Sequence, residues 1–162
     1  MTEQEIRSRQ PGPELDRLIA ETFYNARPCA IEGREGMFVI IGDFGPNDVR
    51  PFSGGWYDMR STEEKAWESI PKYSTNISVA MEVAEKLQAI EELNGKKVRL
   101  MVKITILRGR YQVAVIDYLN EVSLSEVITE SGPEALTKAA LLALRGGNRG
   151  EPTQGMPALW LR

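Results

Sequence analysis

Residues 97–118 read KVRLMVKITILRGRYQVAVIDY, and this stretch decides the fold. Apolar residues occupy every second position of its first half, which is typical of a β-strand with one apolar face. They are Val98, Leu100, Val102, Ile104 and Ile106. Arg108-Gly109 predicts a tight turn, and the alternation resumes from Tyr111 to Ile116. We therefore predict an antiparallel hairpin at the centre of a small sheet, with residues 122–128 as a further edge strand.

Three helices are predicted around this hairpin, at Glu14–Phe23, Asn76–Ile90 and Glu134–Leu144. Asn76 is the expected N-cap of the second helix, and Ser131 stands three residues before Glu134, the spacing of a capping box. Each helix has an apolar stripe that predicts its buried face. The stripes are Leu15, Leu18, Ile19 and Phe23; Ile77, Ala80, Met81, Ala84 and Leu87; and Leu136, Ala139, Ala140 and Ala143. The expected fold class is α/β (α+β): a small antiparallel-rich sheet packed by three main helices in a sandwich.

Shorter elements are predicted between the first two helices. Residues 29–31 and 37–41 have the character of strands, and the glycines between them suit a hairpin connection. Ser61–Glu64 suits the cap of a short helix that carries Ala66 and Trp67. The first ten residues are charged, and we expect them to be frayed.

The chain ends in a tail, residues 148–162, that includes Leu159-Trp160-Leu161. Such residues are costly to leave in water, so we expect the tail to dock on its own subunit or on a neighbouring one. Together with the alanine-rich face of the third helix, this predicts a homo-oligomer. Residues 1–147 are expected to form a single domain with a loop-rich insertion at 26–68.

Composition narrows the classes of function. The 162 residues have a formal net charge of −3 and include no histidine, so the usual general base near neutral pH and the commonest metal ligand are missing. A negative net charge argues against a dedicated nucleic-acid binder. The single cysteine, Cys29, suits a reducing cytoplasm, and no apolar stretch approaches the roughly 20 residues that span a membrane. We expect a soluble cytoplasmic protein without a membrane anchor.

Three stretches resemble the phage ABA (α-β-α) sandwich domain family. They are GPELDRLIAE at 12–21, IPKYSTNI at 70–77 running into MEVAEKL at 81–87, and GP at 132–133 through AALLAL at 139–144. The middle stretch is the most specific, although Asn76 stands where the family usually has Asp, and Met81 where it has Trp. The resemblance covers roughly 100 residues including the strand pair, and leaves out 26–68 and the tail. It implies a phage origin and an α/β sandwich, and it implies no activity.

The first candidate ligand site lies ahead of the second long helix, at Tyr73, Ser74 and Thr75. Hydroxyl groups beside the free backbone N–H groups of a helix start suit an anion. Simple helix capping also explains these residues, and both interpretations stay open.

Two further candidate sites combine aromatic and basic side chains. In the loop at 52–60, Trp56 and Tyr57 suit stacking on a purine and Arg60 suits a phosphate. The same aromatics also suit a small apolar cluster. Basic residues of the strand pair suit phosphate groups or a solvated face. The loop residues are Phe52, Trp56, Tyr57 and Arg60; those of the strand pair are Arg99, Lys103, Arg108 and Arg110, with Tyr111 beside them.

The function that we expect is that of a noncatalytic phage accessory protein in the cytoplasm of the infected host. It binds and sequesters a small anionic molecule, a nucleotide immune signal being the specific candidate, and so serves anti-defence. The alternatives are a protein–protein inhibitor of a host factor, a weak RNA-binding domain on the basic strands, and a metal-dependent phosphodiesterase built on Asp43, Asp48 and Asp58. No nucleophile motif or phosphate-binding loop is present, so we expect no enzymatic activity, no cofactor and no metal.

Overall fold

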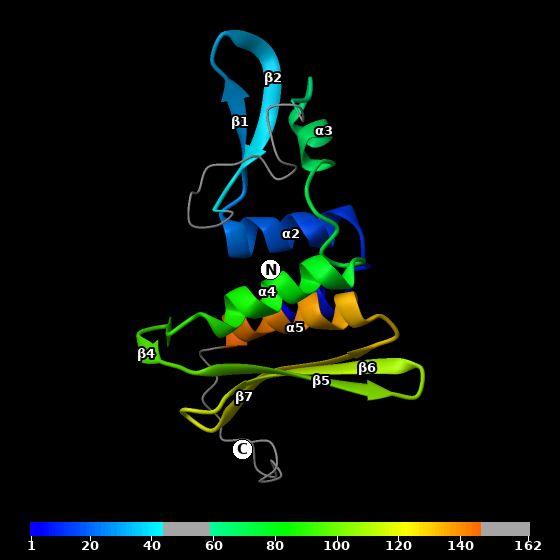
Figure 1. Ribbon diagram of the computed structural model, residues 1–162, viewed down its shortest axis with the longest axis vertical. Helices are drawn as coiled ribbons and strands as arrows, with labels where there is room; N and C mark the ends of the chain where they lie inside the picture. Colours follow the sequence, from blue (N-terminus) through cyan, green and yellow to red (C-terminus); the bar gives the residue numbers. More distant parts are fainter. Residues whose placement is uncertain (44–58, 147–162) are drawn as a thin grey trace. The chain divides into compact units, whose positions relative to one another are not determined.

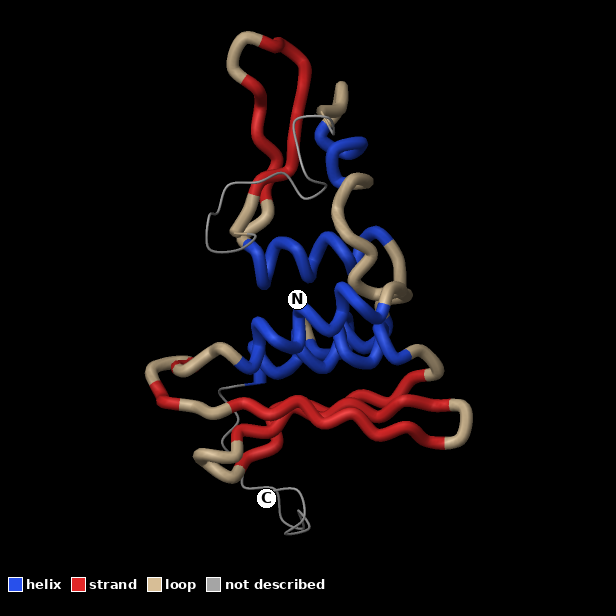
Figure 2. Tube along the Cα trace, viewed as in Figure 1, coloured by secondary structure: helices blue, strands red, loops and turns tan. Residues whose placement is uncertain are grey.

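The computed structural model describes residues 1–43 and 59–146 (Figures 1 and 2). The chain forms two compact units. The sheet unit combines Met1–Arg9 with the chain from Ser74 onward, and the α2 unit comprises Gln10–Tyr73. The segment predicted as an insertion, 26–68, lies within the α2 unit.

The sheet unit is built on three antiparallel strands, in the order β5-β6-β7 (Figure 2). They are β5 (Leu100–Leu107), β6 (Arg110–Asp117) and β7 (Val122–Thr129). β5 pairs with β6 from Leu100 opposite Asp117 to Leu107 opposite Arg110. Gly109 has a φ of 70°, a conformation that glycine adopts without strain, so the chain reverses within two residues. The predicted hairpin and the predicted edge strand are both confirmed.

A second, smaller hairpin precedes this sheet. It consists of β3 (Glu92–Leu93) and β4 (Lys96–Lys97), and the sequence analysis missed it. Asn94 and Gly95 have φ angles of 50° and 78°, the positive values that a two-residue hairpin turn requires. The Asn-Gly pair therefore closes a hairpin of its own between α4 and β5.

Helices α4 (Ile77–Gln88) and α5 (Gly132–Gly146) lie on one face of the β5-β6-β7 sheet (Figure 1). α5 packs on β6 and β7, and α4 lies beside α5. The predicted stripe of α5, at Leu136, Ala139, Ala140 and Ala143, is buried as expected. Ala135, Leu141 and Leu142 are buried too, so the alanine-rich face is already used inside the subunit. It is therefore not the oligomer contact that the sequence suggested.

The buried face of α4 differs from the predicted one. Ile77 is 49% exposed and Met81 is 39% exposed, whereas Val83 is fully buried. The buried stripe is Ala80, Val83, Ala84 and Leu87. Its spacing is as regular as that of the predicted stripe, and its small alanines suit close packing against α5, so periodicity alone does not separate the two. The prediction that Met81 keeps a buried family position was wrong.

The first ten residues were expected to be frayed, and this was also wrong. Glu3–Ser8 form helix α1, which packs against α5, and Ile6 is buried. Thr2 and Glu5 form a capping box: the Glu5 N–H donates to the Thr2 hydroxyl, and the Thr2 N–H donates to the Glu5 carboxylate. A Thr-x-x-Glu spacing satisfies two N–H groups of the first turn, so a charged segment of this length becomes helical once its one apolar side chain is buried.

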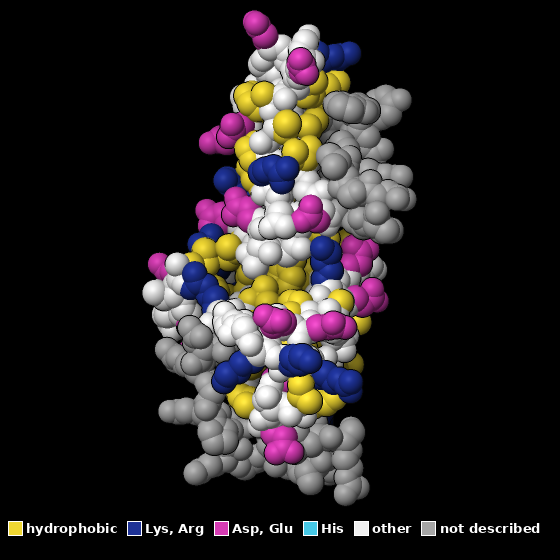
Figure 3. Space-filling model, turned by 90° about the vertical axis from the view of Figure 1, so that its left-hand side faces the viewer, with side chains coloured by type: hydrophobic (Ala, Val, Ile, Leu, Met, Phe, Trp, Pro, Cys, Tyr) yellow, Lys and Arg dark blue, Asp and Glu magenta, His cyan; other side chains and the backbone are white. Residues whose placement is uncertain are grey.

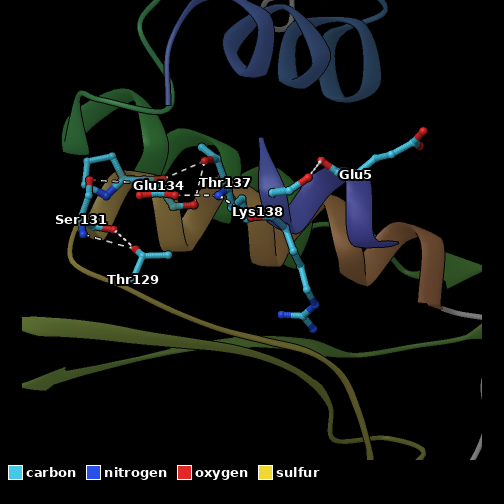
Figure 4. Close-up of polar contacts among 9 residues, drawn as sticks. Glu5, Thr129, Ser131, Glu134, Thr137 and Lys138 are labelled. Carbon is cyan, nitrogen blue, oxygen red and sulfur yellow. Dashed lines mark hydrogen bonds and ion pairs between the residues drawn. The ribbon is translucent and has the colours of Figure 1, made fainter. Parts of the chain in front are cut away.

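Lys138 ties α1 to α5 (Figure 4). Its buried Nζ donates to the Arg7 carbonyl at 2.9 Å and to the Glu134 carboxylate at 2.6 Å. Glu134 was expected to complete a capping box with Ser131. Its N–H does lie 3.5 Å from the Ser131 hydroxyl, but its carboxylate pairs with Lys138. A buried ammonium needs a charged partner more than a part-buried helix start needs a second cap.

The α2 unit contains α2 (Pro13–Tyr24), the antiparallel pair β1 (Arg27–Ile31) and β2 (Arg34–Ile41), and α3 (Glu63–Trp67). All four were predicted in type and position. Two ring contacts hold the unit together: Tyr24 stacks on Tyr73 with centroids 5.4 Å apart, and the Arg17 guanidinium lies 4.4 Å from the Trp67 ring. Leu18 and Phe23 are half-buried, whereas Leu15 and Ile19 are fully buried.

The described residues thus form an α+β fold with small antiparallel sheets and a helical layer, as the sequence predicted. Within residues 1–43 and 59–146, no helix has the length and apolar character needed to cross a bilayer.

Candidate functional site

A depression of about 750 Å³ opens in the sheet unit where α4 ends and the chain passes through β3 and β4 into β5. We call it the β3–β4 depression. Three segments line it: the end of α4 with the strand that follows, the start of β5, and the turn after β6. The lining residues are Gln88, Ala89, Ile90, Glu91, Glu92, Lys97, Val98, Arg99, Leu100, Tyr118 and Leu119.

Main-chain hydrogen bonds of the β3–β4 hairpin form one wall of the depression. Glu92 lies opposite Lys97 in the β3–β4 register, and the Val98 N–H donates to the Glu91 carbonyl at 2.9 Å. The positive φ angles at Asn94 and Gly95 let the chain reverse in two residues. These main-chain pairings fix the positions along the wall of the two acidic residues, Glu91 and Glu92, and of the basic residue Lys97.

Asp117 organises the opposite wall. Its buried carboxylate accepts the N–H groups of Arg99 and Leu119, each at 3.1 Å, and that of Asn120 at 3.4 Å. The Asn120 amide donates to the other Asp117 oxygen and to the Lys97 carbonyl. A short side chain that accepts from its own following residues stabilises a tight turn. Asp117 and Asn120 thus join the segment from Lys97 to Arg99, between β4 and β5, to the turn that carries Leu119.

The chemistry of the depression is mixed. Lys97 and Arg99 are exposed cations, and Tyr118 and Leu119 present exposed apolar surface. Glu91 and Glu92 add two exposed carboxylates. Figure 3 looks onto the side on which β4 lies in Figure 1, and there Lys and Arg side chains lie beside Asp and Glu side chains. Such a site suits a ligand with a flat part for the ring, an anionic part for the cations and a hydrogen-bond donor for the carboxylates.

Tyr73, Ser74 and Thr75 do not form an open site in this structure. Tyr73 is buried and stacks on Tyr24 within the α2 unit, and Ser74 is fully buried. Asn76 is the N-cap of α4, as predicted, and its side chain accepts the Ser78 N–H at 2.9 Å. Thr75 is the exposed member of the three.

The predicted basic strand face is divided by the structure. Arg110 pairs with Leu107, eight residues along β5 from Arg99, which is about 27 Å at about 3.4 Å per residue. One small ligand therefore cannot touch both arginines. Tyr111 belongs to the helix side of the sheet, since a side chain added at Gly132 of α5 would meet its ring at 3.4 Å.

The third predicted group falls largely outside the described residues. Phe52, Trp56 and Tyr57 lie in the segment 44–58, outside the described residues. That they bind a ligand therefore remains a prediction. Arg60 follows this segment, and its main chain pairs with Phe38 of β2 through bonds of 2.8 and 2.9 Å. Its guanidinium donates to the Met59 carbonyl at 3.3 Å.

Two signals in the sequence would have located the depression. Asn94-Gly95 is a strong hairpin turn, and Asp117 followed by Asn120 suits a tight turn at the end of a strand. Among the described residues, no cluster of three or more acidic or cysteine side chains is placed to hold a metal ion. Of the aspartates considered for such a site, Asp48 and Asp58 lie outside the described residues.

Comparison with known families gives one finding. The chain matches the model of the phage ABA sandwich domain over residues 39–141, which is well over half of its 162 residues. Neither a curated protein nor a solved structure matches the chain. The match begins inside the segment 26–68 that the resemblance had left out, and it excludes the stretch at 12–21. The middle stretch, 70–87, lies fully within it.

Proposed function

Because the chain belongs to the phage ABA sandwich domain family, which indicates a phage protein, we propose that it binds and sequesters a small anionic molecule of the infected host. The ligand class is a nucleotide, an immune signal being the specific candidate, and the protein acts in the host cytoplasm without transforming its ligand. The site is the β3–β4 depression.

One observation carries this proposal. Arg99, a predicted ligand residue, lies in a depression that also presents Lys97 and Tyr118. Two cations suit phosphate oxygens, and a guanidinium binds them in bidentate fashion. The exposed Tyr118 ring suits a base, because stacking of a base on an aromatic side chain contributes about 1–3 kcal/mol.

The size and the remaining polar groups agree with such a ligand. A volume of about 750 Å³ lies within the roughly 300–1,000 Å³ typical of small-molecule sites. Glu91 and Glu92 offer acceptors for the hydroxyl or amino groups of a nucleoside, and they disfavour a ligand that is only anionic. This combination favours a nucleotide over inorganic phosphate.

Calorimetric titration with a panel of linear and cyclic nucleotides tests the proposal. Arg99→Ala removes a charge-assisted hydrogen bond worth roughly 1.5–3 kcal/mol, so we expect binding to weaken by about tenfold to a hundredfold. Arg34→Ala is the matched control, since it removes an exposed guanidinium at the start of β2, in the other compact unit. It should leave the affinity within about twofold. Equal losses for the two variants, or no nucleotide bound below millimolar concentration, contradict the proposal.

Two further arms separate it from its rivals. Chromatography of the nucleotide after long incubation should return it intact, because a protein that only sequesters its ligand leaves the ligand unchanged. Hydrolysis would favour the phosphodiesterase alternative. Trp56→Ala tests the predicted loop site in the same titration. If it abolishes binding while Arg99→Ala does not, the ligand sits at the loop and not in the depression.

A further inference from the structure

The two edge strands of the β5-β6-β7 sheet differ in how their outward main-chain groups are covered. At the β7 edge, the Arg7 guanidinium of α1 donates to the Glu126 carbonyl at 3.0 Å, and a register shift near Val115 interrupts the ladder. Covering groups and bulges of this kind protect an edge strand from pairing with another chain. At the other edge, β5 pairs only with β6 among the described residues.

The geometry of the turn shows which β5 residues face outward. Leu107 and Arg110 flank a two-residue turn and so form a hydrogen-bonded pair, after which bonded and non-bonded pairs alternate. The Tyr118 N–H donates to the Arg99 carbonyl at 3.0 Å, which fits the same alternation at the far end. Leu100, Val102, Ile104 and Ile106 therefore direct their N–H and C=O groups away from β6, into the open edge.

The same residues also present apolar side chains there. Ile104 is 40% exposed, Ile106 is 76% exposed, and the adjoining Leu107 is 40% exposed. Ile104 and Ile106 project from one face of β5 and Leu107 from the other, next to main-chain groups that pair with no described strand. An edge that combines both features is a template for the addition of a strand.

We propose that this edge pairs with β5 of a second copy of the chain, antiparallel and with the twofold axis at Ile104. In this register Ile104 faces its own copy, Val102 faces Ile106 and Met101 faces Leu107, so apolar residues meet on both faces of a continuous six-stranded sheet. Lys103 faces Thr105, so no like charges are opposed. The proposal does not rest on the proposed ligand.

Charge disfavours a neighbouring register of the same pairing. A twofold axis one residue earlier sets Lys103 against Lys103, which is unfavourable directly across a ladder. With the axis at Ile104, Arg108 of the second copy lies opposite Leu100, at the end of β5 where Glu91 and Glu92 line the β3–β4 depression. The basic turn of each copy thus lies near Glu91 and Glu92 of the other, and also near its Lys97 and Arg99.

Light scattering at micromolar concentration tests the pairing. The wild-type chain should show twice its mass of 18.1 kDa. Ile106→Lys puts a charge into the paired edge and should give the monomer, and Ile104→Pro should do the same, since proline removes an outward N–H without disturbing the β6 pairing. Ile128→Lys is the matched control, an exposed isoleucine of β7, and should remain a dimer. A monomeric wild type, or a dimer that survives Ile106→Lys, overturns the proposal.

The register has its own test in a Cys29→Ser background. With the axis at Ile104, the two Cα atoms of Ile104→Cys lie about 5.5 Å apart, so a short bismaleimide should join the copies. Two copies of Ile106→Cys are offset by four residues, or about 14 Å along the strands, and should cross-link far less. A dimer in which Ile106→Cys joins more readily than Ile104→Cys contradicts the proposed pairing.

Discussion

Replacing Asp117 by alanine should loosen the β3–β4 depression without unfolding the chain. The buried carboxylate accepts three main-chain N–H groups and one amide N–H, and these bonds join the start of β5 to the turn after β6. Hydrogen bonds to a charged group contribute roughly 1.5–3 kcal/mol each, but they are not additive. Since Leu119 and Asn120 are exposed, water replaces part of their bonds. We expect a total loss of about 2–3 kcal/mol.

Asp117→Asn separates geometry from charge. The amide keeps one acceptor oxygen for the N–H groups of Arg99 and Leu119, but its NH₂ group then faces the Asn120 amide, donor against donor. We expect a smaller loss, about 1–2 kcal/mol. Glu130→Ala removes an exposed carboxylate of the same unit and should change the free energy of unfolding by less than about 0.5 kcal/mol.

Urea unfolding followed by circular dichroism measures these losses, and amide hydrogen exchange locates them. The Arg99 N–H should exchange faster in Asp117→Ala, while the amides at the centre of α5 keep their protection. The reasoning is refuted if Asp117→Ala costs less than about 0.5 kcal/mol, or if the Arg99 amide exchanges no faster than in the wild type.

Other predictions concern α1 and the β5–β6 turn. Lys138→Met keeps the volume but leaves the Glu134 carboxylate without its ammonium, and should lower the free energy of unfolding by about 2–3 kcal/mol in urea. Thr2→Ala removes one half of the capping box and should cost about 1 kcal/mol, seen as faster exchange of α1 amides. The Thr2 N–H holds the pKa of Glu5 below its ordinary value of 4.5. The stabilisation of α1 by this hydrogen bond is therefore complete above pH 4.5 and is lost as the pH falls through the lower folded pKa. Exchange of α1 amides at a series of acidic pH values should follow this loss. Gly109→Ala should cost about 1–2 kcal/mol in the same urea assay, because φ is 70° there.

Most of the fold could be predicted from local patterns. The alternation at 98–106, the Arg108-Gly109 turn and the cap at Asn76 each have a physical cause within a few residues, and the structure confirms all three. The failures depend on partners far along the chain. α1 is stabilised by α5, more than 120 residues away, and the face that α4 buries is set by its neighbour rather than by its own spacing.

The candidate site was harder to predict for the same reason. Arg99 and Arg110 were grouped by their charge, although the predicted turn at Arg108-Gly109 already implies that they lie at opposite ends of the hairpin, and the pairing of β5 with β6 confirms it. Lys97 and Tyr118 are brought to one depression by the β3–β4 hairpin and by Asp117. Tyr73 and Ser74 were predicted from residue type alone, and residue type does not tell how far each side chain is buried in the structure.

The most direct test of the central claim is an amide NMR titration of the wild-type chain with the nucleotide panel. If a nucleotide binds in the β3–β4 depression, the resonances that shift most should be those of residues 88–92, 97–100 and 118–119, while residues 126–130 at the end of β7 stay unchanged. Shifts centred on residues 52–60, or on residues 126–130, would contradict the account, and so would a spectrum that no nucleotide changes.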